Sequence, residues 1–465
     1  MTRPGTLGEL RASSWVSRPV KDEVRANAAR KVAIGEPLVD GVLGYEDTVL
    51  PQLENALLAG HDVIFLGERG QAKTRIIRSL TALLDEWSPI VAGSEINDDP
   101  YSPVSHHARV LVAERGDDTP VEWVHRDRRF GEKLATPDTS IADLIGEVDP
   151  IRVAEGRYLS DELTIHYGLV PRTNRGIFSI NELPDLAERI QVGLLNVLEE
   201  RDVQIRGYKI RLPLDVMLVA SANPEDYTNR GRIITPLKDR FGAQIRTHYP
   251  LDVDVEMEVV AQEAAPLRVD GLSVRVPEYM TEIVAGISQH ARRSPHINQR
   301  SGVSVRLSVA NHETLVANAA RRALRDGDDE VVPRVSDLDA LVSSTSGKVE
   351  FETLDDGREE QVLERIVKGA VLEVFRSRCR PETLTGLVDS FEEGLVAHTG
   401  DDMAATEYMG LIPQLDLGDV FSDLGVGEHP AEVASAVEFV LEGLHLSKRL
   451  NKDAIGGRAS YRARG

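Results

Sequence analysis

Residues 62–74 read Asp-Val-Ile-Phe-Leu-Gly-Glu-Arg-Gly-Gln-Ala-Lys-Thr, and no other segment constrains the fold as strongly. Four apolar residues, 63–66, run directly into a glycine-containing turn that ends in Lys73 and Thr74. The residues that follow, 75–84, have apolar positions spaced as on one face of a helix. A strand, a glycine loop, Lys-Thr and a helix in this order predict a cradle for the phosphates of a nucleotide.

Each residue type in this loop has a physical role in holding phosphate. Gly67 and Gly70 let the backbone approach an anion closely, and the N–H groups of residues 68–74 then point at the phosphates. Lys73 is expected to reach the β- and γ-phosphates of ATP, and the Thr74 hydroxyl to help hold Mg²⁺. The predicted loop residues are Gly67, Glu68, Arg69, Gly70, Gln71, Ala72, Lys73 and Thr74.

One position departs from the usual pattern G-x-x-x-x-G-K-[ST]. Ala72 stands where the last glycine is expected. Alanine is the smallest alternative, and it is tolerable there if its φ is negative.

A nucleotide hydrolase also needs an acidic pair for Mg²⁺ and water, and the pair is expected after a buried strand. The segment 176–182, Gly-Ile-Phe-Ser-Ile-Asn-Glu, fits, with Asn181 where an aspartate is usual. Glu182 is expected to orient or deprotonate the attacking water, and Asn181 to touch the Mg²⁺ water shell without a charge. An ordinary helix cap is the structural alternative for Asn-Glu at this point.

Three further residues are candidates for the chemistry. Asn223, in the polar cluster that ends the strand segment 215–224, is placed to position water, although Asn-Pro also forms turns. Arg240 could project onto the nucleotide of a neighbouring subunit, or simply be surface charge. Arg306 could reach back to the γ-phosphate from a helical lid; Arg321 and Arg322 compete for that role.

Strands that alternate with helical segments over residues 36–250 predict an α/β fold with a parallel sheet. Residues 1–35 are expected to be an N-terminal arm, and 143–170 a hairpin insert. Short strands are expected at 110–113 and 121–124. The pattern becomes helical after that, which predicts a lid over 251–345, a C-terminal helical region over 346–455 and a disordered tail over 456–465.

Composition excludes several classes of protein. A net charge of −22 over 465 residues argues against nucleic acid as the partner. No apolar run is long enough for a membrane span, and the start of the chain resembles no signal peptide, so a cytoplasmic location is expected. The single cysteine, Cys379, excludes an internal disulfide. His106 and His107 have no third ligand at a defined spacing, so a metal site is not expected there.

Taken together, these motifs resemble those of AAA+ ATPases, in the group of the magnesium-chelatase I subunit and MoxR. The resemblance covers about residues 36–330. It implies that Val42, Leu43 and Gly44 lie beside the adenine and that residues 67–74 are Walker A. It further implies that Asn181 and Glu182 form Walker B and that Asn223 is sensor 1. Arg240 would then be the arginine finger, and Arg306 would be sensor 2 in the lid.

The resemblance also implies a homo-oligomeric ring, typically a hexamer, and a partner with a von Willebrand factor A domain. Residues 346–465 lie outside it, so a MoxR-like remodeller of a protein client, or a chaperone for cofactor insertion, is favoured over tetrapyrrole chelation. Asn181 leaves an alternative open, namely an ATP-binding scaffold with little hydrolysis. A transcriptional activator of the AAA+ type is disfavoured by the acidic charge and by the lack of a recognisable helix-turn-helix.

Overall fold

The chain folds into two compact units, Met1–His248 and Tyr249–Gly465. The computed structural model describes residues 3–148, 165–199, 203–205, 208–210, 212–223, 232–299, 301–352, 358–380, 384–415, 417, 419–455 and 457–464. No helix in these ranges is long and apolar enough to cross a membrane.

A five-stranded sheet with the order β11-β1-β10-β7-β4 forms the centre of the first unit, and all its neighbouring strands are parallel. The predicted parallel α/β sheet is therefore confirmed. Since parallel strands end at one edge, the segments after β1, β7 and β10 meet there. The strands are β1 (Val63–Leu66), β4 (Phe130–Leu134), β7 (Gly176–Asn181), β10 (Val216–Ala222) and β11 (Ala243–Arg246).

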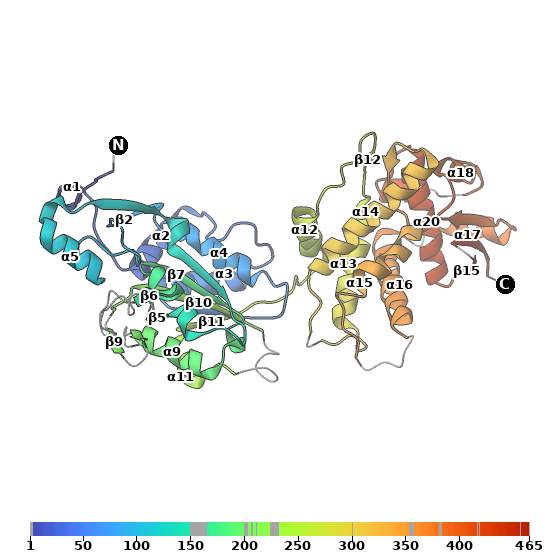
Figure 1. The fold of residues 1–465 in the computed structure, drawn as a ribbon. Helices are drawn as coiled ribbons and strands as arrows, with labels where there is room; N and C mark the ends of the chain where they lie inside the picture. The colour runs from blue at the N-terminus through green and yellow to red at the C-terminus, as the bar shows by residue number, and fades with distance from the viewer. Residues whose placement is uncertain are drawn as a thin grey trace. The chain divides into compact units, whose positions relative to one another are not determined.

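The three central strands, β1, β10 and β7, are buried on both faces, which explains why they are mainly apolar runs. Successive side chains alternate between the faces, so Val63 and Phe65 pack in one core and Ile64 in the other. Helices α2 (Val20–Ile34), α3 (Val49–Ala59) and α4 (Lys73–Ser79) cover the first face, and α9 (Glu188–Glu199) and α11 (Thr235–Arg240) lie on the second (Figure 1).

The segment predicted as an N-terminal arm is an integral part of the first unit. Val20, Val24 and Ala28 of α2 are buried in the same core as β1. Glu23 of α2 accepts two hydrogen bonds from the buried Arg129 guanidinium, at 2.9 and 2.7 Å. The arm is thus held by apolar packing and by a buried ion pair.

Smaller elements complete the first unit. The helices are α1 (Leu7–Ala12), η1 (Leu80–Leu83), α5 (His106–Arg115), η2 (Gly116–Asp118), η3 (Arg126–Arg129), α6 (Ile141–Leu144), α8 (Leu169–Arg172) and η5 (Leu183–Asp185). The remaining strands pair in antiparallel twos: β2 (Trp87–Val91) with β3 (Val121–His125), β5 (Gly146–Val148) with β6 (Ile165–Tyr167), and β8 (Val203–Ile205) with β9 (Tyr208–Ile210).

Two sequence expectations fall on these elements. The strand predicted at 110–113 is wrong, because Ser105 accepts a hydrogen bond from the Ala108 N–H and so caps the helix α5. The antiparallel strands β5 and β6 lie at the two ends of the predicted 143–170 hairpin. The part of this prediction that falls on residues 149–164 lies outside the described residues.

The second unit is built mainly from helices around one core. Its helices are α12 (Val253–Glu263), α13 (Glu278–Arg293), α14 (Arg306–Asp326), η6 (Val335–Leu341), α15 (Val342–Thr345), α16 (Glu359–Arg378), α17 (Thr385–Glu392), α18 (Ala405–Met409), η8 (Ile412–Gln414), α19 (Val420–Asp423) and α20 (Pro430–Leu446). Its strands are β12 (Ser273–Val274), β13 (Glu330–Val331), β14 (Ala397–Gly400), β15 (Leu450–Ile455) and β16 (Arg458–Ala463).

The division predicted between a lid and a C-terminal region at 345/346 does not appear in this unit. Tyr279 of α13 stacks on Phe439 of α20, with ring centroids 4.6 Å apart, and both belong to one hydrophobic core. Each of the two predicted regions has an apolar face that its own helices do not bury. These two faces pack against each other in one core.

The prediction of a disordered tail is also wrong. Strand β16 pairs with both β14 and β15, and Tyr461 is buried. Ala459, Tyr461 and Ala463 alternate toward the core, while the Arg458 and Arg462 guanidiniums pair with carboxylates at 2.7 and 2.8 Å. The basic residues that suggested disorder form the outer face of a strand.

Candidate functional site

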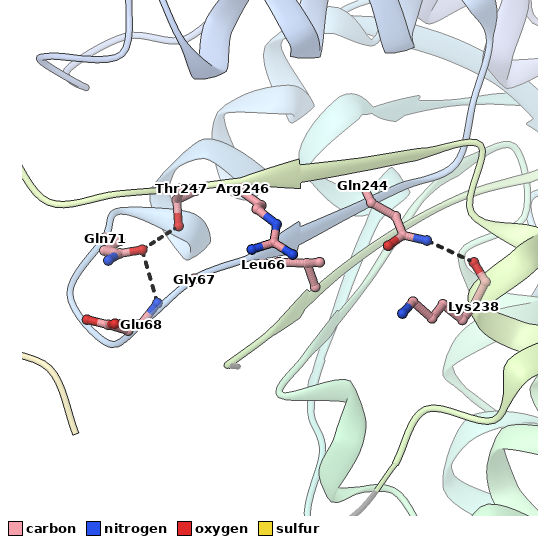
Figure 2. Close-up of a pocket in the computed structure, with 8 residues that line it drawn as sticks. All are labelled: Leu66, Gly67, Glu68, Gln71, Lys238, Gln244, Arg246 and Thr247. Atoms are coloured by element: carbon pink, nitrogen blue, oxygen red, sulfur yellow. Dashed lines mark hydrogen bonds between the residues drawn. The ribbon is translucent and has the colours of Figure 1, made fainter. Parts of the chain in front are cut away.

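The loop between β1 and α4 is closed by its own side chains. The Gln71 side-chain oxygen accepts hydrogen bonds from the Glu68 N–H at 3.0 Å and from Thr247 Oγ1 at 2.7 Å (Figure 2). A Cβ at Gly67 would lie 1.9 Å from Thr247 Oγ1 and 2.2 Å from Gln71 Oε1, so a larger residue would displace both side chains and break their hydrogen bond. Gly70 has a φ of 75°, in the region that glycine enters without strain.

Ala72 has a left-handed backbone, with φ 53° and ψ 9°. The expectation that its φ would be negative is therefore wrong. The chain must turn sharply here to begin α4, and glycine, which the usual pattern has at this position, makes that turn without a Cβ clash. An alanine in this conformation costs about 1–2 kcal/mol.

Lys73 extends its ammonium into the loop. Its Nζ donates to the Glu68 carbonyl at 2.7 Å and to Asn223 Oδ1 at 2.7 Å, and also to the Gly67 carbonyl. The residue is only 7% exposed. The cation therefore lies between the predicted phosphate loop and the end of β10.

Asn223 and Glu182 are brought together at the ends of adjacent strands. Asn223 Nδ2 donates to Glu182 Oε2 at 2.8 Å. Glu182 has a left-handed backbone, with φ 56° and ψ 50°, and its N–H donates to Ser221 Oγ at 3.3 Å. Non-glycine residues in this region cost about 1–3 kcal/mol and are concentrated at functional sites.

Asn181, at the end of β7, makes its contacts to the two neighbouring strands. Its Nδ2 donates to Glu132 Oε1 on β4, and its Oδ1 accepts from Ser221 Oγ on β10 at 3.3 Å. With the Thr74 hydroxyl and the Glu182 carboxylate, the Asn181 carbonyl completes a set of hard oxygen donors of the kind that Mg²⁺ prefers. The donor chemistry of these residues fits the ion.

The segment expected beside the adenine packs against the loop. Val42 is buried, and the Arg75 guanidinium of α4 donates to the Gly41 carbonyl at 2.8 Å. The Tyr45 hydroxyl lies 2.9 Å from the Gln71 carbonyl oxygen and 2.7 Å from that of His248. Burial raises the pKa of Tyr45 to about 12. Leu43 and Gly44, which lie in the chain between the buried residues Val42 and Tyr45, are half-buried.

A pocket of about 610 Å³ opens beside the loop, between the ends of β1 and β11 (Figure 2). Two cationic side chains and one carboxylate belong to its lining. The lining residues are Leu66, Gly67, Glu68, Gln71, Lys238, Gln244, Arg246 and Thr247.

The two predicted arginines come from helices and not from the strand ends that carry this cluster. Arg240 ends α11 with an exposed side chain. Arg306 begins α14, also exposed, and belongs to the second unit. Their roles toward a nucleotide remain predictions.

Sequence reasoning missed Glu132 and Ser221, the two side chains that contact Asn181. Glu132 lies on an edge strand that was not predicted, because the strand's side chains are only partly buried and show no clear alternation. Ser221 lies in the predicted strand two residues before Asn223, and that spacing was the signal that could have found it.

Comparisons with known proteins show what this chain is similar to. A model of the sigma-54 interaction domain matches residues 155–240. The magnesium-chelatase 38 kDa subunit of Cereibacter sphaeroides is 31% identical over 44% of this chain and 56% of its own length. Subunit ChlI-1 of magnesium chelatase from Arabidopsis thaliana is 27% identical over 56% of this chain and 65% of its own.

One chain in a structure of the complex between subunits BchI and BchD of magnesium chelatase aligns over 98% of its length with 70% of this chain, with 22% identity and a TM-score of 0.36. The chain thus spans less than two thirds of the length of the curated relatives named above. The chain is similar in sequence to the magnesium-chelatase I subunits, and its parallel central sheet is that of an AAA+ P-loop α/β fold.

Proposed function

We propose that this chain binds ATP with Mg²⁺ and hydrolyses it. The observation that carries the proposal is the line of hydrogen bonds from Lys73 through Asn223 to Glu182. These hydrogen bonds link the Lys73 ammonium, which would bind phosphate, to the Asn223 amide and the Glu182 carboxylate. The three residues follow the strands β1, β10 and β7. These are the groups that phosphoryl transfer to water requires.

Each residue has a distinct role in this proposal. Lys73 binds the β- and γ-phosphates, and Glu182 orients the attacking water and accepts its proton. Asn223 holds Glu182 in position and contacts the water. Bound Mg²⁺ supplies positive charge that stabilises the phosphate oxygens. Thr74, Asn181 and Glu182 would hold it.

We further propose that the protein works as a homo-oligomeric ring, a hexamer by analogy with its group. Arg240 is exposed, as an arginine that completes a neighbour's site must be. In this proposal Arg306 contacts the γ-phosphate, and residues 42–44 contact the adenine. The partner carries a von Willebrand factor A domain, and the ring remodels a protein client, in the manner of MoxR, or assists metal or cofactor insertion in the cytoplasm.

One observation favours a second function, an ATP-binding scaffold that gates partner assembly with little hydrolysis. Asn181 has no charge where an aspartate is usual, so the Mg²⁺ water shell is held less strongly. Binding through Lys73 and the loop does not depend on that charge.

Steady-state ATPase measurements on the full chain, with light scattering for mass, distinguish the two functions. We expect Mg²⁺-dependent turnover from a ring-sized species, lost in Glu182→Gln and retained in Glu188→Gln, which changes an exposed carboxylate on α9. Tight ATP binding without turnover would support the scaffold. Unchanged turnover in Glu182→Gln would contradict the proposed catalytic role.

A further inference from the structure

Glu132 and Asn181 lie side by side on the same face of the central sheet. Glu132 of β4 is the register partner of Ser179 of β7, and Asn181 follows Ser179 by two residues. Residues two apart on a strand point to one face. The Asn181 amide nitrogen donates directly to Glu132 Oε1.

This contact decides which way the Asn181 side chain is turned. An amide has two N–H donors on one side and a carbonyl oxygen on the other. Because the nitrogen is directed to Glu132 on β4, the oxygen is directed to the opposite side, where it accepts from Ser221 Oγ of β10 at 3.3 Å. That side also carries Glu182 and Asn223, which follow β7 and β10.

We propose that Glu132 is a positioning residue that supplies, through the Asn181 amide, the negative charge that an aspartate at position 181 would provide. A hydrogen bond to an ionised carboxylate is stronger than a neutral one, and it increases the electron density on the amide oxygen. The Asn181 oxygen then presents a more negative acceptor to the water shell of a divalent cation. This inference rests on the proposed function.

The Glu132 carboxylate has a second partner, Arg78 of α4. The Arg78 guanidinium donates to Glu132 Oε2 at 2.8 Å and to Oε1 at 3.2 Å. The Arg78 side chain is 63% exposed, whereas that of Glu132 is 21% exposed. Solvent therefore screens the charge of the arginine more than that of the carboxylate. We expect Glu132 to keep its effect on Asn181 with or without Arg78.

The test measures binding of Mn²⁺, a paramagnetic substitute for Mg²⁺, to the full chain with a non-hydrolysable ATP analogue. In Glu132→Gln we expect Mn²⁺ affinity in this complex to fall by about 10-fold or more, as for other carboxylates behind a metal ligand. Binding of the analogue without metal stays at the wild-type level. Electron paramagnetic resonance counts the free Mn²⁺, so the readout does not depend on turnover.

Two variants separate this role from simple structural damage. Arg78→Gln breaks the same ion pair but leaves the Asn181 contact, and we expect wild-type Mn²⁺ affinity. The double variant, Glu132→Gln with Asn181→Asp, has its carboxylate at position 181, beside the proposed metal site, instead of at position 132. We expect its Mn²⁺ affinity to recover. Asn181→Asp alone places two carboxylates in contact, so its gain is smaller than in the double variant.

Three outcomes would overturn the inference: wild-type Mn²⁺ affinity in Glu132→Gln, an equal loss in Arg78→Gln, or no recovery in the double variant. Failure of the wild-type chain to bind the analogue at all would instead overturn the proposed function. That result is visible before any variant is made.

Discussion

The side-chain amide of Asn223 donates a 2.8 Å hydrogen bond to the Glu182 carboxylate. The oxygen of the same amide accepts from Lys73 at 2.7 Å, so one asparagine joins the ends of β7 and β10 to the loop after β1. A residue that contacts both a proposed phosphate-binding cation and a proposed base could transmit the presence of phosphate to that base.

Asn223→Ala should therefore lower turnover much more than nucleotide binding. Without its amide, Glu182 loses a fixed position, and misplacement of a reacting group costs about 100-fold in rate. Lys73 keeps its contacts to the loop carbonyls. Steady-state ATPase rates and fluorescent-nucleotide titration check both parts, with Asn451→Ala, an exposed asparagine of the second unit, as the control. Equal losses in affinity and rate would contradict the prediction.

Ala72→Gly should stabilise the first unit by about 1 kcal/mol, because it removes the left-handed strain, partly offset by the greater freedom of unfolded glycine. All three tryptophans, Trp15, Trp87 and Trp123, lie in this unit, so their fluorescence in urea reports its unfolding alone. Ala29→Gly, in the exposed interior of α2, is the matched control and should lose about 1 kcal/mol. A loss in both variants would show that position 72 is unstrained.

Tyr45 should make the first unit sensitive to alkaline pH. Its pKa is raised by burial to about 12, so the folded state holds the phenol proton more tightly than the unfolded state does. This contribution is fully present below about pH 10 and is lost as the pH rises toward 12, at about 1.4 kcal/mol per pH unit.

Tyr45→Phe should be less stable than wild type at neutral pH, by about 1 kcal/mol for the lost hydrogen bonding. Between pH 10 and 12, its free energy of unfolding should fall less steeply than that of wild type. Urea titrations at several pH values, followed by tryptophan fluorescence, measure both slopes. If the free energy of unfolding fell equally steeply with pH in wild type and in Tyr45→Phe, the raised pKa of Tyr45 would be contradicted.

Glu23→Gln should destabilise the first unit by about 3–5 kcal/mol, because it leaves the buried Arg129 guanidinium without its counter-charge. Asp22→Asn, which removes an exposed pair with Arg25, should change stability by about 0.5 kcal/mol or less. The same tryptophan signal measures both variants. If both variants lost the same free energy of unfolding, the buried pair of Glu23 and Arg129 would not be what holds the N-terminal segment in the first unit.

Several elements were predictable because their signals are local. The apolar run 63–66, the glycines of the loop and the helix beyond it follow from neighbouring residues, and the parallel sheet follows from the alternation of strands and helices. The failures have equally specific causes. Val110–Ala113 has the composition of a strand, yet the Ser105 cap begins a helix there. The tail 458–463 was judged by its basic residues, whereas the alternation of Ala459, Tyr461 and Ala463 and the hairpin signal Gly456-Gly457 carried the information.

By itself, the sequence determined the strand, loop and helix of residues 63–84, the strands β7 and β10, and the residue types that follow β1, β7 and β10, because these depend on periodicity and on local backbone chemistry. Only the tertiary structure decided which side chains meet. Lys73 and Asn223 are 150 residues apart, and Asn181 and Glu132 are 49 apart. Such contacts are set by strand register and by which face a side chain points to, and a single residue of register would reverse them. The left-handed backbone of Ala72 has the same origin, since the packing of α4 on the sheet imposes a turn that alanine alone would avoid.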